Sequence, residues 1–591
     1  MPDIVHVNYE RTGHSKRLDA LGMRPMQARV FEQRRRQYLL VKAPPASGKS
    51  RALMFVGLDK LVHQGLRKVI VAVPERSIGR SFEPAELSRY GFFRDWDPKP
   101  EWNLCIAGAA GGLVARRMVA TLRAFLDGPD QILICTHATL RFAFDQVGAE
   151  AFDDCLVAVD EFHHASASEE NRLGELVRAL MTRDRAHIAA MTGSYFRGDA
   201  APVLMPEDET RFTTVTYTYY EQLNGYEHLR SLGIGYHFYR GSYIEGLPEI
   251  LDSDRKTILH IPHPNSREST GDKYAEVERI IEILGTYRGI DPSSGFLRVE
   301  RADRRMLKIA NLVDDDDPAV RARVSEGLRH VERPEDVDLI LALGMAKEGF
   351  DWIWCEHALT IGYRNSLTEI VQIVGRTTRD APGKEHAQFT NLIAEPDTSS
   401  ENVIDAVNDM LKAITASLLM EQVLAPDFNF RARQEDEVGS TAEAGENGAI
   451  EISVGGLAEP STERVQAIVN DDMDDLIARV CQDPQVATHA TANPDVAPET
   501  VNQVMIPRII EERYPQLEER EREEVRQQLV ARMAVASEIA EAGRDGGQTG
   551  DGAEESGGET GAGRSQQGLL TLVRRFINVR DIDIDLIDQI N

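Results

Sequence analysis

Short apolar runs rich in β-branched residues recur along the first 400 residues, separated by stretches with helical periodicity. Strands that are buried on both faces read as continuous apolar runs, so this pattern predicts parallel sheets covered by helices. Five runs lie before residue 200: Tyr38–Lys42, Val69–Val73, Ile132–Cys135, Leu156–Val159 and His187–Met191. Four more follow: Thr257–Ile261, Asp338–Leu343, Ala358–Ile361 and Gln388–Ile393. We therefore predict two α/β domains in tandem, over residues 1–205 and 206–400.

Beyond residue 400 the buried runs stop and the pattern becomes helical or polar. We predict a helical extension over residues 401–433, a linker over 434–460 and a mostly helical region over 461–540. Residues 541–567 are Gly-rich, acidic and nearly free of apolar side chains, so they cannot bury enough surface to offset the entropy of ordering. We predict a disordered linker there, followed by a docking segment over 568–591.

The docking segment has two interpretations. Residues 581–586 alternate between Asp and apolar side chains, so an extended strand would present one apolar face to the sheet edge of a partner. An amphipathic helix over Leu569–Phe576 that folds onto the same chain explains the sequence equally well.

The net charge of −29 is concentrated near the C-terminal end. Residues 401–591 contain 38 Asp and Glu against 16 Lys and Arg, which leaves a charge of only −7 for the first 400 residues. The acidic sum therefore does not exclude a nucleic-acid partner for the two α/β domains. We expect the acidic third to be dispensable for nucleic-acid binding, because it would repel the same partner.

Neither export nor membrane insertion is indicated. The sequence has no apolar run of roughly 18 residues and no secretory signal at its start, so we expect no membrane segment and a cytoplasmic location. Its five cysteines are scattered, which argues against a disulfide framework or a zinc pair.

A phosphate-binding loop is the first sign of chemistry. The segment Ala43–Ser50 (APPASGKS) lies between a predicted strand and a helix. In such a loop the backbone N–H groups surround the phosphates, a Lys contacts the β- and γ-phosphates, and a hydroxyl binds Mg²⁺. Gly48, Lys49 and Ser50 supply these groups. The first glycine of the usual motif is replaced by Ala43, so a chance turn is the alternative.

An acidic pair follows the apolar run Leu156–Val159. In Asp160-Glu161-Phe162-His163, the Asp at the end of a buried strand can hold Mg²⁺, and the adjacent Glu can orient or deprotonate an attacking water. Exposed acidic strand ends are common, but the upstream phosphate-binding loop favours the catalytic interpretation.

Two arginines form a third candidate group. Arg376 and Arg379 lie one helix turn apart in residues 372–379 (QIVGRTTR), so we expect them to project to the same side. Two guanidinium groups that enter from a second domain can stabilise charge on a γ-phosphate. A solvated helix face is the ordinary explanation of such a pair, and the preceding motifs outweigh it.

Taken in order, these motifs resemble the superfamily 2 helicases and translocases, in the branch with an Asp-Glu-x-His motif that includes restriction-enzyme motor subunits. The resemblance covers residues 20–395 and implies two tandem RecA-like domains with ATP in the cleft between them. It implies that Arg24 and Gln27 bind adenine, and that the ATP site is completed by Ala46, Ser47, Gly349, Asp351 and Gln372. It also implies that Pro74 and Thr136 contact the nucleic-acid backbone. Hydrolysis would be coupled to strand movement by His163, Thr192 and Ser194.

The sequence departs from the family pattern at two positions. Ala46 stands where relatives often have Gly, and Gly193 replaces the Ala of the third motif. Neither change removes a catalytic group, so ATPase activity is still expected.

The resemblance implies an ATP-dependent helicase or translocase that uses ATP and Mg²⁺, and it favours DNA as the track. No nuclease or methyltransferase motif is evident in the sequence. We therefore expect a motor that works with a separate nuclease or another protein partner through its C-terminal region, in DNA processing or antiviral defence. Two alternatives stay open: an RNA helicase, and an ATP-gated switch that recruits partners through its acidic C-terminal region.

Overall fold

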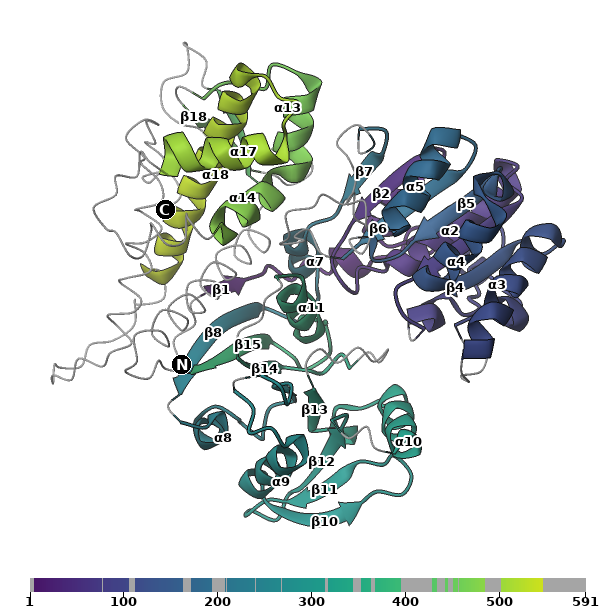
Figure 1. Cartoon of the computed structure of the whole chain (residues 1–591). Helices are drawn as coiled ribbons and strands as arrows, with labels where there is room; N and C mark the ends of the chain where they lie inside the picture. The colour runs from purple at the N-terminus through teal and green to yellow at the C-terminus, as the bar shows by residue number, and fades with distance from the viewer. Residues whose placement is uncertain are drawn as a thin grey trace.

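Two sheets that are mostly parallel, their flanking helices and a C-terminal region of helices with a small sheet form the described part of the chain (Figure 1). The computed structural model describes residues 5–76, 78–105, 112–162, 172–193, 208, 210–239, 241–266, 268–313, 317–343, 352–362, 367–394, 428–432, 442–444, 450–454, 457–483 and 501–545. The predicted fold class, two RecA-like domains followed by a mostly helical region, is confirmed.

The first sheet has the strand order β4-β3-β5-β6-β2-β7 and is parallel throughout its described length. Its strands are β2 (Tyr38–Lys42), β3 (Lys68–Val73), β4 (Ile132–Thr136), β5 (Cys155–Val159), β6 (His187–Thr192) and β7 (Thr213–Thr216). Its helices are α1 (Pro25–Glu32), α2 (Lys49–His63), α3 (Gly112–Asp127), α4 (His137–Val147) and α5 (Arg172–Arg183). All five strands predicted before residue 200 lie in this sheet.

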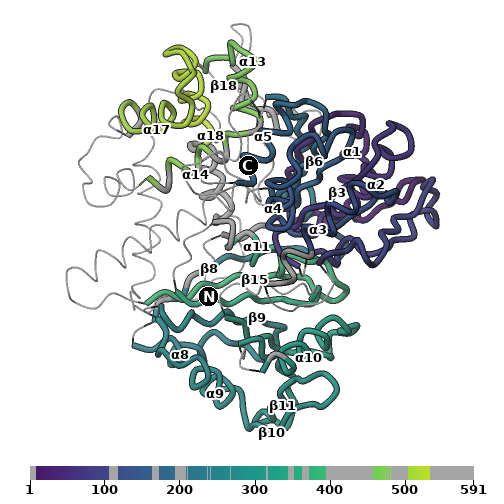
Figure 2. The backbone as a smooth tube through the Cα atoms, turned by 45° about the vertical axis from the view of Figure 1, so that its right-hand side comes forward, coloured from purple at the N-terminus to yellow at the C-terminus, as the bar shows by residue number. Residues whose placement is uncertain are grey.

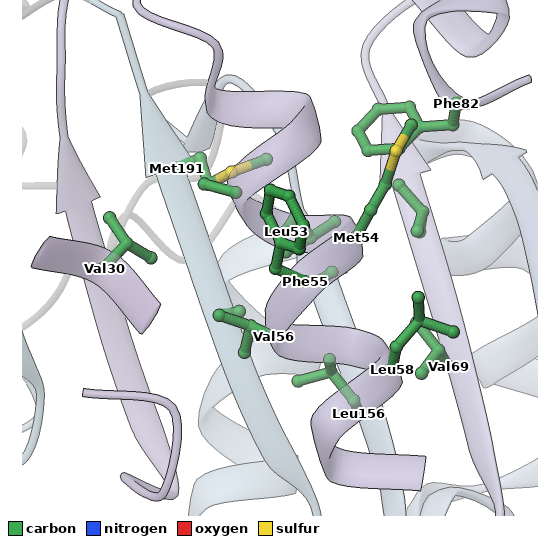
Figure 3. Packing of buried hydrophobic residues seen from close by; sticks show 14 of the residues in the cluster. Val30, Leu53, Met54, Phe55, Val56, Leu58, Val69, Phe82, Leu156 and Met191 are labelled. Atoms are coloured by element: carbon green, nitrogen blue, oxygen red, sulfur yellow. The ribbon is translucent and has the colours of Figure 1, made fainter. Parts of the chain in front are cut away.

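Helix α2 is embedded in the core of the first domain. Residues Ala52 to Leu61 are all buried, as expected of a helix that packs against the sheet on one side and further elements on the other. Figure 3 shows Leu58 of α2 beside Val69 of β3 and Leu156 of β5. At about 1.5–3 kcal/mol for each fully buried large apolar side chain, this packing fixes the start of α2 on the sheet. The loop that precedes α2 is fixed with it.

The second sheet has the order β1-β8-β15-β14-β9-β13-β12-β11-β10 among the described strands. Strands β8 to β12 of this order pair in parallel, while β1 at one edge and β11 and β10 at the other are antiparallel. The strands are β1 (Val5–Asn8), β8 (Ser231–Tyr239), β9 (Thr257–Ile261), β10 (Thr286–Ile290), β11 (Leu297–Glu300), β12 (Met306–Asn311), β13 (Leu339–Leu343), β14 (His357–Ile361) and β15 (His386–Ala394). The helices are α7 (Tyr219–Asn224), α8 (Tyr243–Gly246), α9 (Lys273–Leu284), α10 (Pro318–Arg329) and α11 (Leu367–Thr377).

The two sheets do not follow the predicted division at residue 205. Strand β7 lies beyond that boundary but pairs with β2 in the first sheet, and β1, at the start of the chain, pairs with β8 in the second. Both strands contain strand-favouring Val or Thr residues but are only four residues long, so their sequences do not indicate which sheet they join. Pairing between distant segments decided their place.

The N-terminal segment therefore crosses from the second sheet to the first beside the connector that joins β7 to β8. Backbone N–H groups of Tyr9, Thr12, Gly13 and Ser15 donate to carbonyl oxygens of the connector at 2.7 to 3.1 Å. Two parts of the chain thus bridge the domains side by side.

The C-terminal region holds helices and a small sheet. The helices are α13 (Glu463–Ala467), α14 (Met473–Gln482), α17 (Ile506–Arg513) and α18 (Glu519–Asp545), and the sheet has the order β16-β18-β17. The strands are β16 (Phe428–Ala432), β17 (Ala442–Ala444) and β18 (Ile450–Val454).

This sheet corrects the prediction for residues 401–460. Strand β16 lies in the predicted helical extension, and β17 and β18 lie in the predicted linker. Both β16 and β18 alternate apolar and polar residues with period two, a strand signal that the sequence analysis missed. Helix α18 also continues into the first residues of the predicted disordered linker, and residues 546–591 lie outside the described part.

The C-terminal helices share a hydrophobic core with the second domain. One buried cluster joins Leu476 and Ile510 of these helices to Ile234 of β8 and Phe389 of β15. Figures 1 and 2 both show the helices beyond the β1 and β8 edge of the sheet, far from β10. Removal of these helices would expose part of this core, so they should contribute to the stability of the second domain. That the acidic third is dispensable for nucleic-acid binding stays a prediction.

Among the described residues, no helix is both long and apolar enough to cross a membrane.

Candidate active site

Three predicted motifs follow neighbouring strands of the first sheet. The phosphate-binding loop follows β2, Gly193 follows β6 and Asp160 follows β5, and these strands pair in the parallel order β2-β6-β5. Parallel strands have their carboxyl ends at one edge of the sheet, which is where open α/β sheets bind ligands. The topology therefore brings together motifs that lie far apart in the sequence.

The phosphate-binding loop has a left-handed backbone at two positions. Gly48, the N-cap of α2, has a φ of 92°, a conformation that other residues rarely adopt, and a Cβ there would lie 2.5 Å from Nε2 of Gln27 and displace this amide. Ala46 has a φ of 66°, in the region that favours glycine. The loop is therefore strained at the position where relatives often have Gly.

Gln27 holds the loop from α1. Its Nε2 donates to the carbonyl oxygen of Gly48 at 3.2 Å, and its Oε1 accepts from the N–H of Arg24 at 2.8 Å. The amide therefore caps α1 and fixes the loop, and its contact with adenine stays a prediction.

Lys49 lies buried beneath the loop. Its Nζ donates to the carbonyl oxygens of Ala43 at 2.9 Å and Pro44 at 3.1 Å. Burial holds the pKa of Lys49 below its ordinary value, and the guanidinium of Arg379 also lowers it. The carboxyl groups of Glu161 and Asp160 raise the pKa and offset part of this effect. Lys49 is thus close to charged groups of both domains.

Asp160 is a buried carboxyl group directly after β5. Burial, together with the charge of Glu161, raises the pKa of Asp160 to about 7, although Lys49 acts in the opposite direction. A divalent cation beside this carboxylate would favour its charged form. Ser50, in the first turn of α2, is the second predicted ligand, and an all-oxygen set is what Mg²⁺ prefers. These residues fit the predicted metal.

Glu161 is held by the third motif. Its φ of 48° is left-handed, and its Oε2 accepts a hydrogen bond from the N–H of Gly193 at 3.2 Å. A Cβ on Gly193 would lie 3.0 Å from Nζ of Lys49 and 3.3 Å from Oε1 of Glu161. Gly193 therefore connects the second and third motifs, a role that the sequence analysis did not assign to it.

A cavity of about 150 Å³ lies against the loop. Its wall combines Arg24, Ala46 and Ser47 of the first domain with Arg379 of the second. Oγ of Ser47 is buried and has no hydrogen-bond partner among the described residues, so a polar ligand held by the loop could satisfy it. The full lining is Ser15, Lys16, Arg24, Met26, Ala46, Ser47, Tyr217, Gln222, Tyr226, Ile353, Arg379 and Asp380.

Helix α11 brings the second domain to the loop. A Cβ on Gly375 would lie 2.9 Å from Cγ of Pro45, so α11 and the loop are in close contact. Arg379 lines the cavity, whereas Arg376 and the predicted groups Lys49, Ser50, Asp160 and Glu161 are not among its lining residues. The helix ends at Thr377, so the helical spacing that predicted a shared side for the two arginines does not extend to Arg379.

The chain is 52% identical over 593 residues to a protein of Bacillus subtilis (strain 168) named "Putative ATP-dependent helicase YeeB", and the alignment covers 100% of this chain and 93% of that protein. The chain belongs to the ATP-dependent helicases. It is accordingly an enzyme that hydrolyses ATP and acts on nucleic acid, as predicted. No protein-family model matches the chain.

Two solved structures show weaker likeness. The Mycobacterium smegmatis helicase Lhr bound to ssDNA and AMP-PNP is 15% identical, with a TM-score of 0.39, over 68% of this chain and 51% of that one. The ATP-dependent Type ISP restriction-modification enzyme LlaBIII bound to DNA is 11% identical, with a TM-score of 0.42, over 93% of this chain and 40% of that one. This chain spans about half or less of each, and at these TM-scores the likeness supports no further conclusion.

The remaining predicted residues of this helicase fall into two groups. The first group lies within the described residues. Pro74 follows β3, and Thr136 caps α4 by accepting a hydrogen bond from the N–H of Thr139 at 3.2 Å. Thr192 is the buried last residue of β6, and Gln372 is partly buried on α11. His163, Ser194, Gly349 and Asp351 lie outside the described residues.

Two residues beside the cavity were missed by the sequence analysis. Gln222 of α7 donates from Nε2 to the carbonyl oxygen of Pro45 at 3.0 Å. Lys16 forms an ion pair with Asp380 at 2.6 Å. Neither belongs to a recognisable motif, so no local signal could have found them.

Proposed function

We propose that this helicase is a DNA translocase that hydrolyses ATP between its two RecA-like domains, where the phosphate-binding loop faces the second domain. The observation that carries the proposal is the position of Arg379, which comes from the second domain and lines a cavity against the loop of the first. A positive charge at this place is attracted by the γ-phosphate of bound ATP and loses that attraction after hydrolysis. ATP binding and hydrolysis would therefore change the contact between the domains.

The phosphates would be held by the loop and its lysine. Lys49 would leave the carbonyl oxygens of Ala43 and Pro44 for the β- and γ-phosphates. Ser50 and Asp160 would hold Mg²⁺, which neutralises charge on the phosphate oxygens when it is bound.

Glu161 would orient the attacking water. The N–H of Gly193 fixes one oxygen of its carboxylate, so a shift of the third motif would move Glu161 directly. We extend this coupling role to Thr192, Ser194 and His163, because the family resemblance assigns it to them. Gly349, Asp351, Gln372 and Arg376 would complete the second-domain side of the ATP site on the same grounds.

The preference for DNA rests on the resemblance to the Asp-Glu-x-His branch with an Arg-Pro-x-Gln start. Pro74 and Thr136 are the proposed backbone contacts. They follow β3 and β4, which are neighbours in the first sheet, so both lie at the edge where the ATP site is built.

The cellular setting is proposed from the motor character of the chain. A helicase without an evident nuclease motif would work in a multi-protein system for DNA processing or antiviral defence, with a separate nuclease as one partner. The acidic C-terminal region, and residues 568–591 in particular, would bind that partner.

The test is the ATPase rate measured in parallel with no nucleic acid, single-stranded DNA, duplex DNA and RNA. We expect duplex DNA to stimulate most, and binding to weaken with salt by about 0.9 in log K per log[salt] for each phosphate neutralised. The Glu161→Gln variant is the control for contaminating ATPase. Stimulation by RNA alone would replace the DNA proposal with the RNA alternative, and no stimulation by any nucleic acid would contradict the translocase proposal.

A further inference from the structure

Asp380 directly follows Arg379, and its side chain is only 1% exposed. Its Oδ1 accepts hydrogen bonds from the N–H groups of His228 at 2.9 Å and Leu229 at 3.0 Å. Its Oδ2 accepts one from the N–H of Glu227 at 3.1 Å and forms the ion pair with Lys16 at 2.6 Å. Four donors thus surround one buried carboxylate.

These donors belong to the two segments that bridge the domains. Residues 227–229 lie in the connector, and Lys16 lies in the N-terminal segment that runs beside it. The N–H of Ser15, the residue before Lys16, donates to the carbonyl oxygen of Gly225 at 2.9 Å. Asp380 therefore links the segment that contains Arg379 to both the connector and the N-terminal segment.

The charge on Asp380 is stabilised despite its burial. Burial pushes the pKa of Asp380 up, but Lys16 and the three N–H groups outweigh this effect and hold the pKa below its ordinary value. A buried carboxylate with complete hydrogen bonding is a rigid anchor, because any displacement leaves charged or polar groups unpaired.

The backbone at Arg379 is held from the other side as well. The buried Lys384 donates from Nζ to the carbonyl oxygen of Arg379 at 2.9 Å and to that of Ile353 at 3.1 Å. The connector in turn reaches the phosphate-binding loop through the bond from Gln222 to Pro45. A path of hydrogen bonds and covalent backbone therefore runs from the loop to Gln222, along the connector to residues 227–229, and through Asp380 to the adjacent Arg379.

We propose that Asp380 is a positioning residue, which sets the guanidinium of Arg379 opposite the phosphate-binding loop by tying its segment to the connector and to Lys16. The proposal rests on the proposed role of Arg379 in ATP hydrolysis. Misplacement of a catalytic group by about 1 Å can cost about 10²-fold in rate, so loss of the anchor should reduce kcat more than ATP affinity.

The first experiment compares Asp380→Asn with Asp338→Asn. Asp338 is a matched control in the same domain, because its buried carboxylate accepts from the N–H of Lys308 at 2.9 Å and pairs with Lys256 at 2.8 Å and Arg305 at 3.1 Å. We expect Asp380→Asn to lower kcat by about 10²-fold with KM for ATP within about threefold. Asp338→Asn should lower Tm but leave kcat within about twofold.

The second experiment combines Asp380→Asn with Arg379→Ala. If Asp380 acts only through Arg379, the double variant should be no slower than Arg379→Ala alone. Losses that multiply would overturn the proposal, and so would an unchanged kcat for Asp380→Asn beside a low kcat for Arg379→Ala. An unchanged kcat for Arg379→Ala would instead contradict the proposed function.

Lys16→Met serves if Asp380→Asn fails to fold. It removes the same ion pair from the partly exposed N-terminal side and leaves the three N–H bonds in place. We expect a smaller loss of kcat that is again absent in the Arg379→Ala background. A loss that persists in that background would overturn the proposal.

Discussion

Gly375 is the position at which a single added methyl group should separate the two domains. A Cβ there would lie 2.9 Å from Cγ and 3.0 Å from Cβ of Pro45, and 3.1 Å from the hydroxyl oxygen of Tyr219. Ordinary contact begins near 3.4 Å, so Gly375→Ala must shift α11 or the loop by a few tenths of an ångström. The Pro45 ring is rigid and Tyr219 is fully buried, so neither can give way easily.

The magnitude follows from two opposing effects. Overpacking a well-packed contact costs about 1–3 kcal/mol. Ala is favoured over Gly in a helix interior by about 0.5–1 kcal/mol, and Gly375 lies inside α11. The helical gain offsets part of the overpacking against Tyr219, so the fold of the second domain should lose little stability, while the contact between α11 and the loop should weaken by about 1–3 kcal/mol. At about 1.4 kcal/mol per factor of ten, kcat/KM for ATP should fall by about 5- to 140-fold.

The assay is nucleic-acid-stimulated ATPase together with thermal unfolding. Gly57→Ala is the control, because it also replaces a helical glycine but its Cβ would meet Trp96 and Val69 at an ordinary 3.4 Å. The control should keep its kcat/KM and its Tm. A Gly375→Ala variant with native kcat/KM, or one whose activity loss matches a fall in Tm, would refute the argument.

Four further predictions follow from the structure. Glu161→Gln should keep ATP binding but slow hydrolysis by about 10²-fold or more, measured as bound nucleotide against released phosphate. Ala46→Gly should relieve about 1–2 kcal/mol of left-handed strain against about 0.5–1 kcal/mol of chain entropy, so calorimetry should show an unchanged or slightly higher Tm. The pKa of Asp160 is about 7 when folded and near the ordinary 3.8 when unfolded, so this group should make stability fall as pH rises between those values. Asp160→Asn should remove that dependence in denaturant titrations without nucleotide. A chain that ends at residue 456 should melt at lower temperature or aggregate, because it lacks one half of the core shared with the second sheet, whereas a chain that ends at 545 should not.

The sequence by itself determined the central strands of both sheets. All nine predicted runs became strands with boundaries within two residues, because a strand buried on both faces must be apolar at nearly every position. It also predicted the groups that we propose to carry the chemistry of the first domain. Lys49 and Asp160 were predicted because their proposed roles require a residue type at a set distance from a strand end, which is a local property.

Some local signals were present but unrecognised. The period-two alternation in β16 and β18 is a strand signal, yet β16 was predicted to be part of a helical extension and β18 part of a linker. The Gly of the third motif was seen as a neutral departure, although its N–H holds Glu161.

Only the tertiary structure decided which distant segments meet. Strands β1 and β7 joined sheets on the far side of the predicted domain boundary, and the C-terminal helices joined the core of the second domain. Nothing in the sequence distinguishes Asp380 from the other acidic residues. The structure shows that the connector and Lys16 both bind its carboxylate. A local pattern records whether a residue is buried, whereas its partner depends on how the whole chain packs, and that information is not contained in any short stretch of sequence.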